Sequence, residues 1–400
     1  MYVTDNRAIS EVGAVIIGYK NRNIMRSKPA EYSKISTFRE ADTDKPMPQC
    51  SYETRGKFLR QKCKDTNTES QPDILALLLN HMKRSNNSKL PKNIKRLLPK
   101  NLVIDPKHNL TMCITLKAGS TTYRALLAQY SDVFMKQYPK NQSAYDVFHN
   151  DVRKSNRFEI IPAQEATPSQ LYDALTHYHK IVSVRHPFTR LYSFYNGKIV
   201  ESECEAFGPR GYQSQIIDYV RGIRVANEND ACDMNIAFAE FFKYYRDHRQ
   251  HDVNEHLKRI TDACHPCMIK YDTFIRIETS NQDQEYIIDT IFSNPDKEKV
   301  GANSESQQRD AETNQSQLLK AANSQPQPVR HFSANSRIRG VRNNFNQTLD
   351  QYKVLSEIEI DWMQTFYKRD MDLFGYKIEK SENGLLNAIC KIETDNEICC

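Results

Sequence analysis

The sequence has no long hydrophobic run, few glycines and prolines, and little excess charge of either sign. No stretch reaches the ~18 apolar residues that cross a bilayer. The best N-terminal candidate, residues 12–19, is too short and follows a polar lead rather than a signal-peptide n-region. With 12 glycines and 16 prolines, collagen-like and low-complexity chains are excluded. The net charge of +6 permits an anionic partner, and no recognised nucleic-acid-binding motif accompanies it, so we expect no nucleic acid.

Cysteine, in contrast, is frequent. The chain has 10 cysteines, an even number that is high for a reducing cytosol. Asn-x-Ser/Thr sequons begin at Asn86, Asn109, Asn141, Asn314 and Asn346. Together these features favour an oxidising secretory compartment, with disulfides and glycosylation. A signal or anchor would be expected there, so we predict membrane association only if an N-terminal anchor is missing from this chain.

The composition and patterning divide the chain into three parts. The 400 residues, 39% of them hydrophobic, suit one large domain with solvated segments. Residues 1–97 lack sustained periodicity and are predicted to be a flexible lead or stem, with one short helix at 73–83. Residues 98–380 form the predicted domain, with a low-complexity insertion at about 295–329 that is rich in Asn, Ser, Gln and Glu. Residues 381–400 are predicted to be a C-terminal tail.

Two strand–loop–helix units set the predicted fold class. Residues 102–116 end in an apolar run typical of a buried strand, and a turn at 117–120 leads into a helix at 121–130, with Ser120 or Thr121 as its N-cap. Residues 180–184 form a β-branched strand, and Pro187 suits the first position of the helix that follows. Such units favour parallel strands with helical crossovers, hence an α/β fold with helices on the sheet.

Further elements are predicted downstream of these two units. Helical patterns cover residues 235–246, 277–292 and 355–374. A short strand is expected within residues 264–271, after Pro266.

The turn after the first strand is a candidate anion site. Lys117, Ala118, Gly119, Ser120, Thr121 and Thr122 combine a mobile charge, small residues and hydroxyl donors. Backbone N–H groups can converge there on an anion at a helix N-terminus. The alternative is an ordinary capped helix with a solvated lysine, and the local pattern alone favours that alternative.

The second strand-to-helix junction offers a second candidate. Arg185 leaves the carboxyl end of a strand, where ligands bind in α/β sheets, and Ser193 lies two helical turns further on. Both side chains suit a phosphate. The alternative is a salt-bridging arginine and a surface serine.

Cys264 and Cys267 form a Cys-x-x-Cys pair that admits three interpretations. A zinc site needs four ligands, and no second pair follows at finger spacing. A redox pair would begin a helix that follows a strand, whereas an apolar run follows here. Structural disulfides with undetermined partners are the favoured interpretation.

Four ordered blocks together resemble one known family. Residues 113–124 read Cys-Ile-Thr-Leu-Lys-Ala-Gly-Ser-Thr-Thr-Tyr-Arg, and residues 184–195 read Val-Arg-His-Pro-Phe-Thr-Arg-Leu-Tyr-Ser-Phe-Tyr. Asn-Glu-His at 254–256 precedes Cys-His-Pro-Cys-Met-Ile-Lys-Tyr-Asp at 264–272, and a closing block spans 366–376. This order resembles the Golgi carbohydrate sulfotransferases, closest to the chondroitin and dermatan 4-O-sulfotransferases and the HNK-1 sulfotransferase.

The resemblance implies a fold, a donor and residue roles. The fold would be the P-loop-like parallel sheet of sulfotransferases that use 3′-phosphoadenosine 5′-phosphosulfate (PAPS), with no metal. Residues Lys117, Ala118, Gly119, Ser120, Thr121 and Thr122 would hold the 5′-phosphosulfate. Arg185 and Ser193 would hold the 3′-phosphate. Lys117 and His256 would be catalytic, His256 as the base, with His186 and Glu278 as weaker alternatives.

Departures from the family pattern leave the acceptor open. Leu116, Gly119, Thr122 and Tyr123 replace the family's proline, alanine, asparagine and tryptophan in the first block, and Leu257 replaces a tryptophan after the histidine. The leading hypothesis is a Golgi glycan O-sulfotransferase acting on an anionic, glycosaminoglycan-like acceptor, of chondroitin 4-O type. The alternative is a catalytically weak glycan-binding protein on the same fold.

Overall fold

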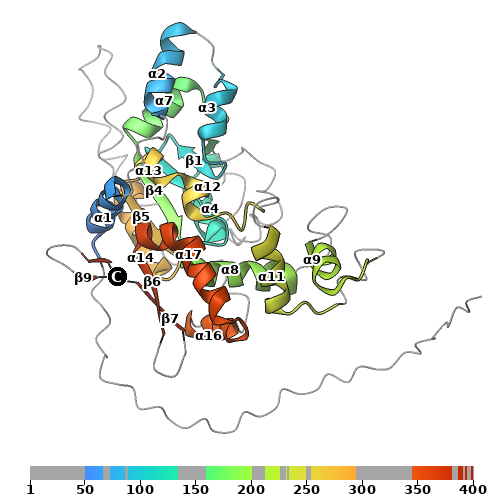
Figure 1. Ribbon diagram of the computed structural model, residues 1–400. Coiled ribbons are helices and arrows are strands. Elements are labelled where there is room, and N and C mark those ends of the chain that lie inside the picture. Colours follow the sequence, from blue (N-terminus) through green and yellow to red (C-terminus); the bar gives the residue numbers. More distant parts are fainter. Residues whose placement is uncertain are drawn as a thin grey trace, which may run out of the picture. The chain divides into compact units, whose positions relative to one another are not determined.

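A five-stranded sheet of order β3-β1-β2-β4-β5 organises the computed structural model (Figure 1). Strands β2 (Leu110–Cys113), β4 (His179–Val184) and β5 (Thr273–Arg276) are parallel, whereas β1 (Leu102–Asp105) and β3 (Ile161–Pro162) are antiparallel to their neighbours. The α/β prediction is therefore confirmed, with a mixed sheet. The structure describes residues 50–65, 73–85, 89–133, 159–200, 212–225, 231, 234–248, 254–293, 345–380, 386–390, 392–393 and 398–399.

The strand predicted over residues 102–116 is a hairpin in the structure. β1 pairs with β2, with Asp105 opposite Leu110. The Asp105 carboxylate accepts from the backbone N–H of His108 and contacts the His108 ring at 2.7 Å, which closes the turn locally. Side-chain hydrogen bonding of this kind by Asp is a common cause of tight turns.

Most of the predicted helices are confirmed within a few residues. The helices that the structure describes surround the sheet. They are α1 (Tyr52–Asp65), α2 (Ile74–Arg84), α3 (Lys92–Leu97), α4 (Ser120–Gln129), α7 (Pro168–Thr176), α8 (Pro187–Tyr195), α9 (Tyr212–Arg221), α11 (Phe238–His248), α12 (Ile260–Cys264), α13 (Pro266–Ile269), α14 (Ser280–Ile287), α16 (Phe345–Asp350) and α17 (Glu357–Phe374). π-helical turns at Asn196–Val200 and Ile288–Phe292 extend α8 and α14. A 3-10 turn, Gln351–Val354, precedes α17.

The strand predicted within residues 264–271 is wrong. This segment forms the end of α12 and the short helix α13. Pro266 begins α13, because its fixed φ suits a first helical turn. His265 and Lys270 adopt left-handed φ values of 45° and 57° on either side of α13, which no extended strand contains.

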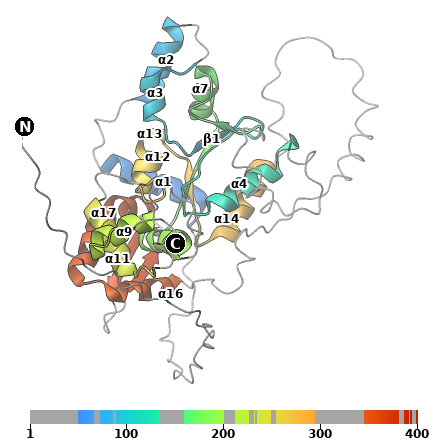
Figure 2. The same cartoon turned by 90° about the vertical axis from the view of Figure 1, so that its right-hand side faces the viewer.

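Alternating side chains bury both faces of the sheet. Leu110, Met112 and Ile181 pack with residues of α4 and α14 in one apolar cluster. Cys113 and Val182 point the other way, into a larger cluster that includes residues of α1, α8, α11 and α17. Figure 2 shows α4 and α14 on one side of the strands and α1, α12 and α17 on the other. This is the three-layer arrangement that parallel strands require.

The structure moves the boundary predicted at residue 98 towards the N-terminus. Arg55 on α1 is fully buried, pairs with Asp283 at 2.9 Å and donates to the Phe274 carbonyl of β5. The compact unit accordingly runs from Met47 to Cys400 and includes α1, α2 and α3.

The end of the chain also departs from the predicted organisation. Within the tail predicted at 381–400, β7 (Leu386–Cys390) pairs with β6 (Tyr376–Lys380), and β8 (Ile392–Glu393) pairs with β9 (Ile398–Cys399). The insertion predicted at 295–329 lies outside the described residues.

The Cys-x-x-Cys pair serves two separate disulfides. Cys264 bonds to Cys113 at the end of β2, and Cys267 bonds to Cys63 on α1. Neither sulfur is therefore a redox partner of the other or a thiolate for zinc. The prediction of structural disulfides is confirmed, and Cys50 is disulfide-bonded as well.

Candidate active site

The predicted anion sites lie at one edge of the sheet, where three parallel strands end. β2 leads into the loop 116–119, β4 into Arg185 and His186, and β5 into residues 277–279. The backbone N–H of Ile277 donates to the Val184 carbonyl, which keeps the second and third connections together. Ligands bind at this edge in open α/β sheets.

The loop 116–119 turns sharply through two left-handed residues. Lys117 has φ 64° and Gly119 has φ 81°. A Cβ atom on Gly119 would lie 2.8 Å from Cε2 of Tyr123 and 2.9 Å from Cδ1 of Ile277, so glycine is required by both conformation and space. The left-handed conformation of a lysine is strained, and strain of this kind clusters at functional sites.

The first turn of α4 faces no capping side chain. Its N-cap is Gly119, not Ser120 or Thr121 as predicted, because the left-handed glycine brings the chain into the helix one residue earlier. No side chain caps the helix at this N-terminus. Within the described residues, no side-chain hydrogen bond engages the hydroxyls of Ser120, Thr121 or Thr122. N–H and hydroxyl donors therefore gather where the helix dipole is positive, an arrangement suited to an anion.

Two small residues, Ala118 in this loop and Gly197 beside it, matter for their size and not for charge. Ala118 is fully buried, so it contributes backbone only. Gly197, in the π-helical turn after α8, lies beneath the Lys117 side chain: a Cβ there would be 2.9 Å from the Lys117 ammonium. Gly197 could not be predicted from the sequence, because nothing local links it to a lysine 80 positions away.

Arg185 links the second junction to the first loop. Its guanidinium donates to the Lys117 carbonyl at 3.1 Å and to the Thr189 hydroxyl at 3.2 Å. These contacts use two of its five N–H donors. Ser193 lies in the last turn of α8, partly exposed, and its hydroxyl has no hydrogen-bond partner among the described residues. The structure thus brings Arg185 to Lys117 directly, with Ser193 on the adjoining helix.

Arg190 holds the loop and the histidine segment together. It is 2% exposed, and its guanidinium donates to the carbonyls of Leu116 at 2.9 Å, Lys258 at 2.6 Å and His256 at 3.0 Å. Two backbone segments that are far apart in sequence, one at Leu116 and one at 256–258, therefore meet at one side chain. Arg190 stands in the block 184–195, but the sequence pattern alone indicates no role for it.

His256 lies in a short turn that is fixed by its backbone. Its N–H donates to the Asn254 side chain at 3.0 Å, and its carbonyl accepts from Arg190. Its ring is partly buried, 6.0 Å from the Phe194 ring on α8. The disulfide between Cys113 and Cys264 adds a covalent tie between this region and β2.

The two alternative bases have structural roles. Nδ1 of His186 accepts from the Phe188 N–H and caps α8, the ring is fully buried, and burial lowers its pKa to about 3. Glu278 accepts from the His186 N–H at 2.8 Å and from the Tyr376 hydroxyl at 3.1 Å. Both carboxylate oxygens are thus engaged, and the imidazole is held neutral away from solvent.

Arg124 on α4 is a second residue without an assigned role from the sequence. It lies one turn after Ser120, on the same helix face. Its Nε atom is buried with no hydrogen-bond partner among the described residues, and burial lowers its pKa. Because a buried N–H without a partner is costly, an anionic ligand that accepts from this Nε would suit the face.

The part of the chain that the structure describes contains neither a cluster of metal ligands nor a helix that could span a membrane. No cluster of three or more His, Cys, Asp or Glu side chains there is arranged to hold a metal ion. No helix in this part combines the length and apolarity that crossing a bilayer requires. Positive charge at the strand ends is supplied by Lys117 and Arg185.

Comparison with known proteins agrees with the geometry. The model of the sulfotransferase family matches residues 100–377. The chain is 28% identical over 214 residues to carbohydrate sulfotransferase 11 of Rattus norvegicus, covering 50% of this chain and 56% of that protein. It is 26% identical over 198 residues to carbohydrate sulfotransferase 14 of Danio rerio, covering 49% and 50%.

A more distant relative shows the same extent of similarity. Carbohydrate sulfotransferase 9 of Homo sapiens is 25% identical over 197 residues, covering 48% of this chain and 40% of that protein. The chain thus spans about half the length of the curated relatives it matches. No solved structure gives a significant match.

Proposed function

The chain belongs to the sulfotransferase family, and from this premise we propose that it transfers a sulfuryl group from PAPS to a sugar hydroxyl. The acceptor we propose is a glycosaminoglycan or related anionic glycan, of chondroitin 4-O type. The names of the relatives, carbohydrate sulfotransferases, support the sugar. One observation carries the proposal: Arg185 donates to the Lys117 carbonyl at 3.1 Å, so two phosphate-type sites adjoin at the strand ends.

The two anionic ends of the donor would occupy these two sites. Lys117, Ala118, Gly119, Ser120, Thr121 and Thr122 would hold the 5′-phosphosulfate through backbone N–H groups, hydroxyls and the ammonium. The uncapped N-terminus of α4 and the buried Nε of Arg124, which has no partner among the described residues, support this assignment. Arg185 and Ser193 would hold the 3′-phosphate, and the unused N–H donors of Arg185 support that role.

The reaction would be an in-line displacement. The sugar oxygen bonds to sulfur, the bond from sulfur to the 5′-phosphate oxygen breaks, and the hydroxyl proton passes to a base. The products are a sugar sulfate, adenosine 3′,5′-bisphosphate and a proton. Lys117 would stabilise charge on the leaving phosphate oxygen, and His256 would accept the proton. As in phosphoryl transfer, positioning and charge stabilisation dominate.

The proposed place of action is the lumen of the Golgi. The disulfides between Cys63 and Cys267 and between Cys113 and Cys264 support an oxidising compartment.

Donor binding is the first test of this function. Calorimetric titration of the full chain with adenosine 3′,5′-bisphosphate, beside ATP, should give selective micromolar binding that Lys117→Ala and Arg185→Ala weaken at least tenfold. Lys57→Ala, an exposed lysine on α1, is the control. If well-folded protein binds no bisphosphate, the sulfotransferase proposal is wrong and the alternative, a glycan-binding protein on the same fold, replaces it.

Turnover is the second test. With labelled PAPS and unsulfated chondroitin, His256→Ala should lower kcat by roughly 10²–10⁴, the range of general-base catalysis, while bisphosphate affinity stays at the wild-type value. If the His256→Ala variant keeps the wild-type kcat, His256 is not the catalytic base.

A further inference from the structure

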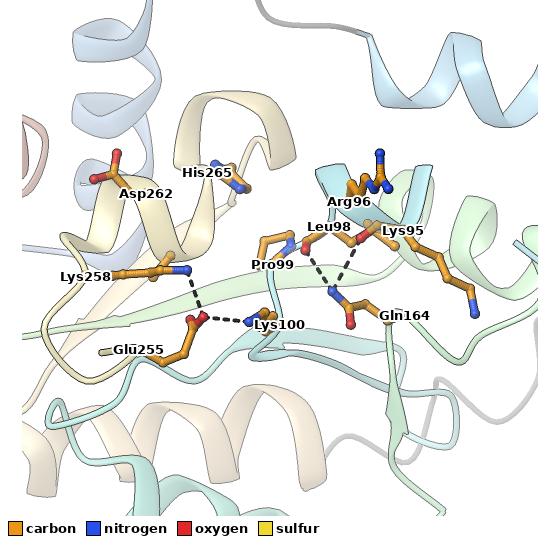
Figure 3. Close-up of a pocket in the computed structure, with 11 residues that line it drawn as sticks. Lys95, Arg96, Leu98, Pro99, Lys100, Gln164, Glu255, Lys258, Asp262 and His265 are labelled. Carbon is orange, nitrogen blue, oxygen red and sulfur yellow. Dashed lines mark hydrogen bonds and ion pairs between the residues drawn. The ribbon is translucent and has the colours of Figure 1, made fainter. Parts of the chain in front are cut away.

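A cavity lies beside the candidate active site, between the end of α3 and the segment 255–265. Its volume is about 350 Å³, within the range of roughly 300–1,000 Å³ that small-molecule sites occupy. Lys95 and Arg96 of α3 and Lys100 line one side, and Glu255, Lys258 and Asp262 line the other. Figure 3 shows Glu255 between the ammonium groups of Lys100 and Lys258. We call this cavity the basic cleft.

The charge of the basic cleft is positive, because its carboxylates are already paired. Glu255 contacts Lys100 at 2.7 Å and Lys258 at 2.8 Å, and Asp262 pairs with Arg259 at 2.7 Å. Interaction with the two lysines lowers the pKa of Glu255 against the opposing effect of burial, so it stays ionised.

The remaining cations of the basic cleft are available to a ligand. Lys95 and Arg96 form no ion pair with any described residue. Lys100, with its side chain 64% exposed, keeps donors for a ligand. An anion of sugar size therefore meets an attractive potential here.

The basic cleft shares its backbone with the histidine segment. Glu255 and Lys258 line the cleft and lie on either side of His256 in the chain. The Lys258 carbonyl accepts a hydrogen bond from Arg190, which also donates to the Leu116 carbonyl. Two residues that line the cleft thus lie one and two positions from the proposed base in the chain. The Cys113–Cys264 disulfide ties the cleft wall to the strand that precedes Lys117. The cleft is placed to hold the part of an acceptor next to the reacting sugar.

We propose that the basic cleft binds an anionic sugar of the acceptor chain, through its carboxylate or sulfate group, while a neighbouring sugar presents its hydroxyl to His256. This assignment rests on the proposed function and extends it, because it names the site where the charged sugar of the acceptor binds. Gln164 supports the site through hydrogen bonds, because its amide donates to the carbonyls of Lys95 and Leu98 at the end of α3.

The test compares variants of the cleft with a matched surface control. Arg96→Ala and Lys100→Ala are made in the full chain. The control is Lys57→Ala, whose ammonium lies 2.7 Å from Glu53 with the side chain 67% exposed, close to the values for Lys100. The probes are an unsulfated chondroitin hexasaccharide, the same hexasaccharide with reduced carboxyl groups, and adenosine 3′,5′-bisphosphate, each titrated calorimetrically and without PAPS.

The proposal expects the two cleft variants to bind the charged hexasaccharide about tenfold more weakly than Lys57→Ala does, the size expected for one charge-assisted hydrogen bond. Their affinity for the bisphosphate should remain that of the wild type. The carboxyl-reduced hexasaccharide should bind weakly and equally to all variants. Unchanged hexasaccharide affinity, or none in the wild type, would overturn the cleft assignment. Loss of bisphosphate binding in the wild type would instead overturn the proposed function.

Discussion

Arg190 offers the sharpest test of how the candidate site is held together. Its three hydrogen bonds join the carbonyls of Leu116, His256 and Lys258. A hydrogen bond from a charged donor contributes roughly 1.5–3 kcal/mol. Arg190→Lys keeps the charge, but a single ammonium lacks the planar fork of donors, so we expect about two bonds to be lost. The free energy of unfolding should therefore fall by about 3–6 kcal/mol.

The same substitution should slow catalysis more than it weakens donor binding. Releasing the His256 turn from the loop 116–119 lets the proposed base shift, and a misplacement of about 1 Å can cost roughly 10²-fold in rate. Urea denaturation gives the stability, bisphosphate calorimetry the donor affinity, and labelled transfer the kcat. Because Arg190→Ala removes all three bonds and risks unfolding, the lysine variant is the informative one.

A surface arginine provides the matched comparison. Arg221 contacts Glu240 at 2.7 Å with its side chain 29% exposed, so Arg221→Lys should change the stability by less than about 1 kcal/mol. If Arg190→Lys unfolds at the same urea concentration as Arg221→Lys and retains wild-type kcat, the proposed linking role of Arg190 is refuted.

Three further predictions concern the loop, a disulfide and pH. Gly197→Ala places a methyl group 2.9 Å from the flexible Lys117 ammonium, so kcat should fall at least tenfold while the melting temperature stays unchanged. A fall in kcat that is accompanied by a lower melting temperature would contradict this. Replacing Cys113 and Cys264 together by alanine opens a loop of 151 residues and should lower the unfolding free energy by about 2–5 kcal/mol, measured in urea without reductant. Burial lowers the pKa of His186 from 6.5 to about 3, so only the unfolded chain binds its proton between these values. Stability from this residue is complete above pH 6.5 and falls by about 1.4 kcal/mol per pH unit below it, a slope that His186→Asn should remove from urea midpoints measured between about pH 6.5 and 4.

Local sequence signals predicted the elements whose structure depends mainly on residues next to one another in the chain. The β-branched run before Arg185, followed by Pro187, forms β4 and α8 as expected. The small-residue turn at Lys117–Gly119 likewise lies between a strand and a helix. These features depend on neighbours in the chain, which a single sequence displays.

Features that depend on distant residues were not predictable in the same way. Arg55 looked like part of a stem, because its partner Asp283 is more than two hundred positions away. Arg190 lies on a helix among apolar residues, and only the folded chain shows the three carbonyls it contacts. The Cys-x-x-Cys segment indicates no helix in the sequence, and the two cysteines beside the left-handed His265 bond to separate, distant elements.

The two disulfides also define a covalent topology. The bond between Cys113 and Cys264 lies inside the loop closed by Cys63 and Cys267, so these two bonds form nested rings. A protease cut anywhere between residues 113 and 264 leaves both halves joined by two bridges. Cleaved protein would therefore migrate as one molecule until a reductant is added. Loss of function after such a cut would report a change in the site itself, because no fragment can leave.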